Sequence, residues 1–205
     1  MKRIVCFYLL IAGVLTACGS LDELTGTSGA SRYKGEFYFP SAAIDSVSGL
    51  DTFKNRWYSY HLNRMNEPIL HTQDEPYEVY RYTNLGTWSA PYTYRIENRG
   101  GVHQLTFVIT SGQGGYHAGS VTNREVVEVS IDEWKELHNR IDSIDFWNTP
   151  VQDGVIGLDG SEWILEGYKD GKYHVLTRWT PDSYGDPVFV RTCRFFSEIY
   201  LENQR

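Results

Sequence analysis

The chain has 205 residues, of which 15% are aromatic, and its formal net charge is −7. The sequence contains no run rich in lysine or arginine. An acidic chain lacks the basic surface that nucleic acids and anionic lipid headgroups require, so neither is an expected partner. The length suits one domain with its own hydrophobic core.

Residues 1–17 have the pattern of a signal peptide. Lys2 and Arg3 form a basic start, and Ile4–Ala17 is an uncharged, mostly apolar stretch of fourteen residues. As a helix this stretch would be roughly 21 Å long at ~1.5 Å per residue, whereas the hydrocarbon core of a bilayer is about 30 Å thick. We therefore predict that residues 1–17 are removed and do not form a permanent membrane span.

The end of this stretch, Leu15-Thr16-Ala17-Cys18, resembles the lipobox of bacterial lipoproteins. The resemblance implies cleavage before Cys18 and attachment of three fatty-acyl chains, palmitate among them, to that residue. Since two or more chains already hold a protein stably in a bilayer, Cys18 is the expected lipidation site and the bilayer an expected partner. Gly19 stands where the family's inner-membrane retention signal, usually Asp, would lie. The expected location is therefore the outer membrane, with the domain facing the periplasm.

Loss of Lys2 and Arg3 with the signal peptide brings the formal charge of residues 18–205 to −9. After lipidation of Cys18, Cys193 is the one thiol left in the mature chain, so no internal disulfide can form. Residues 19–31 are small and polar, and as a flexible tether they would reach about 20 Å. We interpret residues 18–31 as lipidated cysteine and tether, and residues 32–205 as a single α+β domain.

The first part of this domain has the composition of a β-sheet. Aromatic and β-branched residues recur between turn residues, and alternation is visible in "YEVYRY" and "QLTFVIT". The pattern does not distinguish loop from short helix over 41–53. The expected strands are Tyr33–Phe39, Arg56–Asn63, Tyr77–Tyr82, Tyr92–Glu97, Gln104–Ile109 and Glu125–Val129.

The last third predicts a helix, a hairpin and a second helix. "SIDE" at Ser130–Glu133 is a capping box, and an apolar stripe at helical spacing follows it until Pro150, which is expected to end the helix. Asp170-Gly171 predicts a tight turn between strands 162–168 and 172–180. Asp186-Pro187 then begins a helix with a stripe of Phe189, Cys193, Phe196 and Tyr200. On that face Cys193 is expected to be an inert core residue.

The expected fold class is therefore α+β: an antiparallel sheet of about six to eight strands, with two packed helices in the C-terminal third. The segments "SGQGGYHAGSV", "SIDEWKELHNRIDSIDFW" and "GLDGSEWILEGYKDGKYHVLTRW" resemble a recurring pattern in bacterial proteins for which no activity is known. The resemblance covers about the last 95 residues and supports the order of elements, but it implies no function. The matching residues are Gly114, Gly115, Tyr116, Trp134, Phe146, Trp147, Asp159, Gly160, Trp163, Leu165, Glu166, Gly167, Tyr173, His174, Arg178 and Trp179.

Motifs for common catalytic and cofactor chemistry are weak. The glycine-rich loop 111–120 lacks a lysine and precedes an expected strand, so it is interpreted as a demanding turn, not a phosphate cradle. No metal or cofactor is expected, because the histidines lack ligand spacing; only a site assembled from distant residues such as His117 and His174 stays open. His138 is interpreted as a surface helix residue. A serine-hydrolase elbow does not occur.

The tract 159–178 concentrates polar groups and is the candidate ligand-binding region. A two-residue hairpin loop would place Gly167 opposite His174 and Trp163 opposite Arg178. The structural interpretation is a cation–π contact between Arg178 and Trp163. The functional interpretation is a pocket in which Arg178 and His174 hold an anionic group and Glu162 or Glu166 acts as a base. The candidate residues are Asp159, Glu162, Glu166, His174 and Arg178.

Two classes of function follow. The first is a non-catalytic, membrane-anchored envelope module that binds a protein or a cell-wall component. One form of it is an immunity lipoprotein whose acidic surface steers a basic toxin. The second is a periplasmic hydrolase acting through the tract 159–178. The sequence favours the first class.

Overall fold

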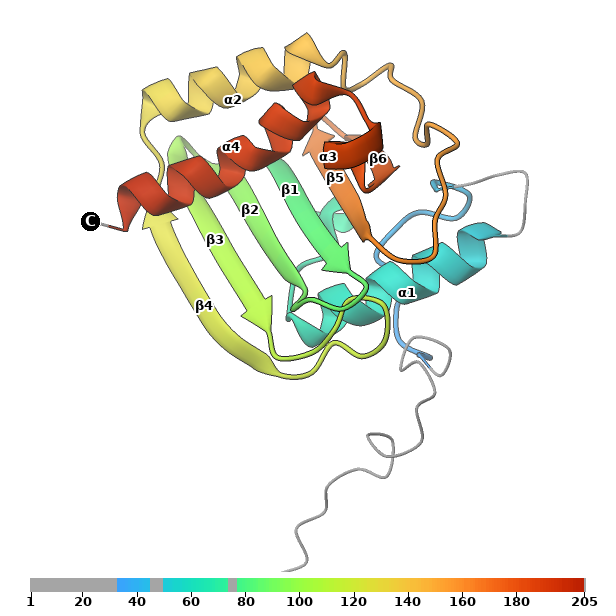
Figure 1. The fold of residues 1–205 in the computed structure, drawn as a ribbon. Coiled ribbons are helices and arrows are strands. Elements are labelled where there is room, and N and C mark those ends of the chain that lie inside the picture. Colours follow the sequence, from blue (N-terminus) through green and yellow to red (C-terminus); the bar gives the residue numbers. More distant parts are fainter. Residues whose placement is uncertain (1–32, 45–49, 74–76, 205) are drawn as a thin grey trace, which may run out of the picture.

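A computed structural model describes residues 33–44, 50–73 and 77–204 (Figure 1). The expected signal peptide, lipobox and tether lie outside the described residues. The described part is an α+β fold, as predicted, with one six-stranded antiparallel sheet in the order β4-β3-β2-β1-β5-β6. The strands are β1 (Tyr77–Gly86), β2 (Tyr92–Arg99), β3 (Val102–Thr110), β4 (Val121–Glu128), β5 (Ser161–Lys169) and β6 (Lys172–Trp179).

Helices cover both faces of the sheet (Figure 1). α2 (Ile131–Ser143) and α4 (Pro187–Asn203) lie across one face, and α1 (Leu50–Arg64) lies against the other. A short helix, α3 (Pro181–Tyr184), precedes α4. Among the described helices, none has both the length and the apolar character that crossing a membrane requires.

The face under α2 and α4 holds the main hydrophobic core. Tyr80 and Tyr82 of β1 pack there with Leu165 of β5 and Phe196 of α4. The predicted capping box is present, since the Ser130 side chain accepts from the backbone N–H of Glu133 and Glu133 accepts from that of Ser130. α2 ends at Ser143, well before Pro150. Two residues later Asp145 has φ = +46°, a left-handed conformation that a helix cannot continue through.

The two predicted C-terminal elements are confirmed. The β5–β6 register pairs Gly167 with His174 and Trp163 with Arg178, as the Asp170-Gly171 turn predicts. Asp186 caps α4 by accepting from the backbone N–H of Val188. Cys193 is fully buried in the core beneath α4, and burial raises the pKa of its thiol well above the usual value, in agreement with an inert residue.

Two of the expected strands are wrong. The segment 33–39 is not a strand, and Arg56–Asn63 belongs to α1. The buried residues Tyr58, Leu62 and Met65 recur at steps of four and three, which is a helical period that the aromatic composition obscured. Tyr38 and Phe39 pack beside α1 in a second core that also contains Tyr58. The N-terminal segment and α1 thus form a layer that the sequence interpretation had assigned to the sheet.

Charged residues lie in the interior on the α1 face. The Arg81 guanidinium of β1 is fully buried and donates from Nε and Nη2 to the two carboxylate oxygens of Glu166 on β5, at 2.7 and 2.8 Å. Its Nη1 donates to the Pro68 carbonyl at 2.8 Å and lies 3.6 Å from the Glu67 carboxylate. Glu67 in turn accepts from Nε of Arg95 on β2 at 2.9 Å. Opposite charges are therefore matched across the three central strands.

Loss of one partner of this network should be costly. We expect Glu166→Ala to lower the free energy of unfolding by about 3–5 kcal/mol, because the Arg81 charge stays buried without its bidentate partner. Urea unfolding followed by tryptophan fluorescence measures this value. The double variant Arg81→Met, Glu166→Leu should lose less than the single variant, since no unpaired charge remains at that position.

The matched control is Glu136→Ala, which removes a partly exposed surface pair with Arg140 on α2. Exposed helix pairs contribute about 0.3–0.5 kcal/mol. A Glu166→Ala variant as stable as Glu136→Ala would show that the buried pair contributes no more than an exposed one.

Candidate functional site

The sheet separates the candidate residues of the tract 159–178. Successive side chains of a strand point to opposite faces, and here Ile164 and Val175 pack on the α1 side while Leu165 and Leu176 pack under α2 and α4. Glu162 and Glu166 therefore face α1. His174 and Arg178 face α2 and α4. The structure does not bring the two carboxylates and the two cationic side chains into one pocket.

Both glutamates have structural partners on the α1 face. Glu166 holds Arg81 and also accepts from the Tyr173 hydroxyl at 3.0 Å. The Glu162 carboxylate is 3.5 Å from Nζ of Lys54 on α1. Burial raises the pKa of Glu162, and the charge of Lys54 opposes that shift. Each carboxylate thus compensates a charge within the fold.

His174 and Arg178 fix the segment that follows α2. Nε2 of His174 lies 3.0 Å from the Thr149 carbonyl, to which it can only donate, and burial lowers the pKa of the ring. Arg178 donates to the carbonyls of Pro150 and Val151 at 2.9 and 2.6 Å. The aromatic ring under its guanidinium is Phe189, at 5.6 Å, in place of the expected Trp163.

Asp159 lies apart from the other four, in the exposed loop before β5. Its carboxylate accepts from Nε1 of Trp88 at 3.1 Å. Trp88 is 61% exposed and follows the end of β1. Asp159 is therefore the one member of the candidate set that is connected with an open surface.

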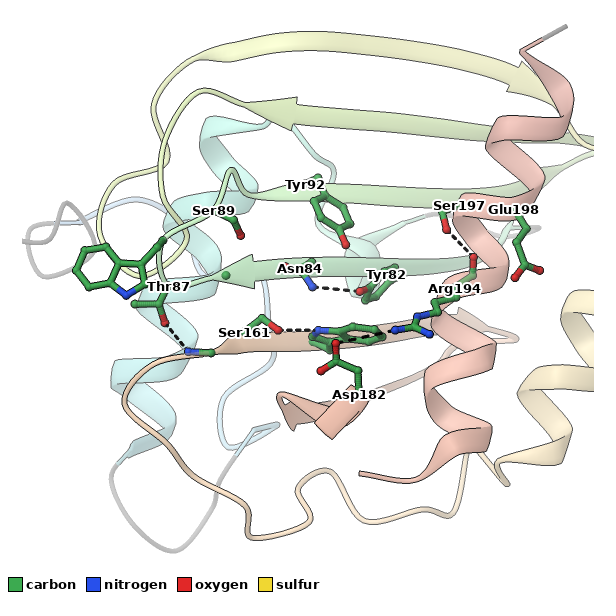
Figure 2. Close-up of a pocket in the computed structure, with 14 residues that line it drawn as sticks. Tyr82, Asn84, Thr87, Ser89, Tyr92, Ser161, Asp182, Arg194, Ser197 and Glu198 are labelled. Atoms are coloured by element: carbon green, nitrogen blue, oxygen red, sulfur yellow. Dashed lines mark hydrogen bonds and ion pairs between the residues drawn. The ribbon is translucent and has the colours of Figure 1, made fainter. Parts of the chain in front are cut away.

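That surface includes a cleft of about 790 Å³ at the end of the sheet where β1 finishes and β5 begins (Figure 2). Thr87 and Ser89 lie at one end of it, and Ser197 and Glu198 of α4 lie at the other (Figure 2). The cleft is elongated, and its walls come from four separate parts of the chain. Its lining residues are Tyr82, Asn84, Gly86, Thr87, Trp88, Ser89, Tyr92, Gly160, Ser161, Trp163, Asp182, Arg194, Ser197 and Glu198.

Aromatic residues of the main core form the inner part of the cleft. The Tyr82 ring centroid is 5.2 Å from that of Trp163 and 6.1 Å from that of Tyr92. The buried Asn84 amide donates to the Tyr82 hydroxyl at 3.2 Å, and Nε1 of Trp163 donates to the Ser161 hydroxyl at 2.8 Å (Figure 2). These polar groups are held in fixed positions by packing, which suits recognition.

Charged side chains line the outer wall. Asp182 of α3 and Arg194 of α4 approach to 4.0 Å, and both are exposed (Figure 2). Glu198 lies one turn further along α4 and is also exposed. The two carboxylates exceed the single guanidinium, so the wall is acidic on balance.

The turn at the other end of the cleft is held by backbone and glycine contacts. The Thr87 backbone N–H donates to the Gly160 carbonyl at 2.8 Å, and the Gly160 N–H donates to the Thr87 hydroxyl at 3.2 Å. A Cβ on Gly114 would lie 2.5 Å from the Leu85 carbonyl carbon, so the glycine loop packs directly on the strand end. This loop is followed by β4, and its interpretation as a demanding turn is confirmed.

Trp88 is positioned by groups from two directions. Its ring centroid is 4.8 Å from that of Tyr116 in the glycine loop, and its indole N–H is bonded to Asp159. Trp88, Asn84, Asp182 and Arg194 are not among the residues that the sequence indicates as candidates. Only Trp88 carried a signal, namely a large aromatic residue in a turn between two strands.

The described residues offer no cluster of three or more His, Cys, Asp or Glu side chains that could hold a metal ion. His117 lies exposed in the glycine loop, whereas His174 lies in β6 and faces α2 and α4. A comparison with models of known protein families and with curated protein sequences finds no match.

His138 is not the surface residue that the sequence suggested. Its Nε2 lies 2.7 Å from the Glu78 carboxylate of β1, and its Nδ1 lies 2.9 Å from the Trp134 carbonyl. Lys169 of β5 approaches the same carboxylate at 3.1 Å. The hydrogen bond with Glu78 raises the pKa of His138, and partial burial opposes that rise. The imidazole therefore connects α2 to the sheet most strongly when it is protonated.

This contact predicts a pH dependence of stability. A raised folded-state pKa means that the folded protein binds more protons than the unfolded chain, so the His138 contribution is complete below the ordinary value of 6.5 and is lost as pH rises through the folded value. Burial lowers the pKa of His61, His71 and His174, and these groups contribute the opposite slope. We therefore expect the stability of the unmodified protein relative to His138→Gln to fall across that window. Urea unfolding at a series of pH values measures this slope.

This downward contribution to the slope should be lost in His138→Gln, which has no titratable ring, and reduced in Glu78→Gln, which lacks the charged acceptor. A His138→Gln variant with the same slope as the unmodified protein would contradict the role of His138.

Proposed function

We propose that the protein is a lipid-anchored lipoprotein of the cell envelope whose folded domain is a binding module and not an enzyme. The proposed location rests on the sequence, which has a basic start, a short apolar stretch and the lipobox-like segment Leu15-Thr16-Ala17-Cys18. Three acyl chains at about 0.8 kcal/mol per buried methylene would make release negligible. With Gly19 after the cysteine, the expected site is the outer membrane with the domain facing the periplasm.

The observation that carries the binding role is the cleft beside α3 and α4. It is open, its inner aromatic and amide groups are held in place, and its outer wall carries exposed charges. A site that recognises a ligand needs this combination of fixed and accessible groups.

The tract 159–178 supports the hydrolase alternative poorly. A base on Glu166 would have to act with His174 through the sheet, since the two side chains point to opposite faces. Glu166 is also fully occupied by Arg81 and Tyr173. Nothing in the geometry of the tract assembles a nucleophile, a base and an open position for substrate.

The anchor is tested by Cys18→Ser in the full chain, expressed in a diderm bacterium. We expect the variant either to become soluble or to keep its uncleaved signal peptide, and in both cases to incorporate no labelled palmitate, because the acylated sulfur is gone. Cys193→Ala is the matched control and should fractionate like the unmodified protein, because Cys193 is buried in the core.

A second variant tests the sorting signal. Gly19→Asp should move the protein to the inner-membrane fraction of a sucrose gradient. Unchanged membrane fractionation and palmitate labelling of Cys18→Ser would refute the anchor.

A further inference from the structure

We propose that the cleft between β1, β5, α3 and α4 binds a linear saccharide that is uncharged or carries amino groups. This inference deepens the proposed function and rests on it. The kinds of side chain that line the cleft, their charge and the shape of the cleft all support a ligand of this class.

The lining contains no aliphatic side chain among the described residues. Of its fourteen residues, four are Tyr or Trp, two are glycine, and the other eight carry a hydroxyl, an amide or a charge. Sites for acyl chains, sterols or apolar peptide side chains are lined mostly by aliphatic and aromatic groups together. Aromatic faces combined with hydrogen-bonding groups instead match a sugar, which has apolar C–H faces and a rim of hydroxyls.

The fixed polar groups suit hydroxyl recognition. Asn84 is 6% exposed and is bonded to the Tyr82 hydroxyl, so its position is set before a ligand arrives. Carboxylate, amide and guanidinium groups can each form two hydrogen bonds in one plane, the geometry that neighbouring hydroxyls of a pyranose ring require. Asp182 and Arg194 supply an acceptor and a donor of this kind at the open wall.

Trp88 supplies the exposed aromatic face at the end of the cleft. An indole that is 61% exposed would normally be free to move, but here Asp159 and Tyr116 hold it. A rigid aromatic surface is a low-cost platform for a flat, partly apolar partner.

The charge and the shape of the cleft restrict the class of saccharide further. The carboxylates of Asp182 and Glu198, together with Asp159 beside Trp88, exceed the single charge of Arg194, so phosphorylated, sulfated or uronic-acid ligands are disfavoured. The lining of the cleft runs from Thr87 and Ser89 at one end to Ser197 and Glu198 at the other (Figure 2). An extended chain of sugar units fits this shape better than a compact molecule.

The test is isothermal titration calorimetry with the full-length protein in a detergent that carries no sugar headgroup. The probes are tetrasaccharides of β-1,4-linked N-acetylglucosamine, its deacetylated form, cellotetraose and maltotetraose, with tetragalacturonate as the anionic comparison. We expect saturable binding of at least one uncharged or amino tetrasaccharide and weaker binding of tetragalacturonate.

Variants locate the binding in the cleft. Trp88→Ala should weaken the affinity for the bound tetrasaccharide about tenfold or more, because the aromatic face that the sugar stacks on is removed. Asp182→Ala should also weaken it. Phe53→Ala is the matched control, because Phe53 is 59% exposed on α1 at the other face of the sheet, and its affinity should not change. All three side chains are exposed, so the variants should fold.

The outcomes separate this inference from the proposed function. Binding that Trp88→Ala and Asp182→Ala leave unchanged would overturn the assignment of the saccharide to the cleft. A second outcome is that no tetrasaccharide binds, while the protein captures an envelope protein and Trp88→Ala abolishes that capture. This outcome would overturn the proposal of a saccharide ligand but would leave the proposed binding role in place. Release of reducing ends from a bound tetrasaccharide would support the proposal of a saccharide ligand and would overturn the proposal that the protein is not an enzyme.

Discussion

The buried pair of Arg81 and Glu166 is the constraint on which the rest of this structure depends. It joins β1 to β5, the two strands that connect the N-terminal hairpins of the sheet to the C-terminal one. Because an unpaired charge in the interior is very unfavourable, the pair fixes how these strands meet and requires a cover that excludes water. Residues 65–71 and Tyr173 provide that cover, and Pro68 and Glu67 complete the bonds of Arg81.

A consequence of this arrangement is that the two faces of the sheet are stabilised by different kinds of interaction. The α1 face holds the matched charges of Glu67, Arg81, Arg95 and Glu166. The α2 and α4 face is mainly an aromatic core, and it also holds His174, Arg178 and the contact between Glu78 and His138. The polar groups that the sequence places close together in β5 and β6 belong to different faces, and each stabilises its own side. The open polar surface is the cleft at the end of the sheet, where β1 finishes and β5 begins.

The elements that the sequence predicts well are those with local signals. Ser130 and Glu133, Asp170-Gly171 and Asp186-Pro187 act on neighbouring backbone groups, so each is readable within a few residues. α1 was missed because the aromatic residues of 56–63 suit a strand by composition, while their spacing is helical. The end of α2 was missed because Asp145, not Pro150, changes the backbone direction.

The cleft could not be predicted by the same reasoning. Its side chains come from the end of β1, the start of β5, α3 and α4, and only the strand order brings them together. Local periodicity indicates which face a residue occupies, but it does not indicate which strand ends become neighbours. The five candidate residues were chosen for closeness in sequence, and alternation along the strands separated them.

The chain enters the described domain on the α1 side, where the ring of Tyr33 contacts that of Tyr60 at a centroid distance of 6.1 Å. The cleft is bounded by the helices of the other side. A domain attached through its N-terminus would therefore carry the cleft on the side opposite its attachment, so that a ligand could enter without passing between the domain and its anchor. The sheet that shields the buried charges from water would thus also separate the N-terminal attachment on the α1 side from the cleft beside α3 and α4.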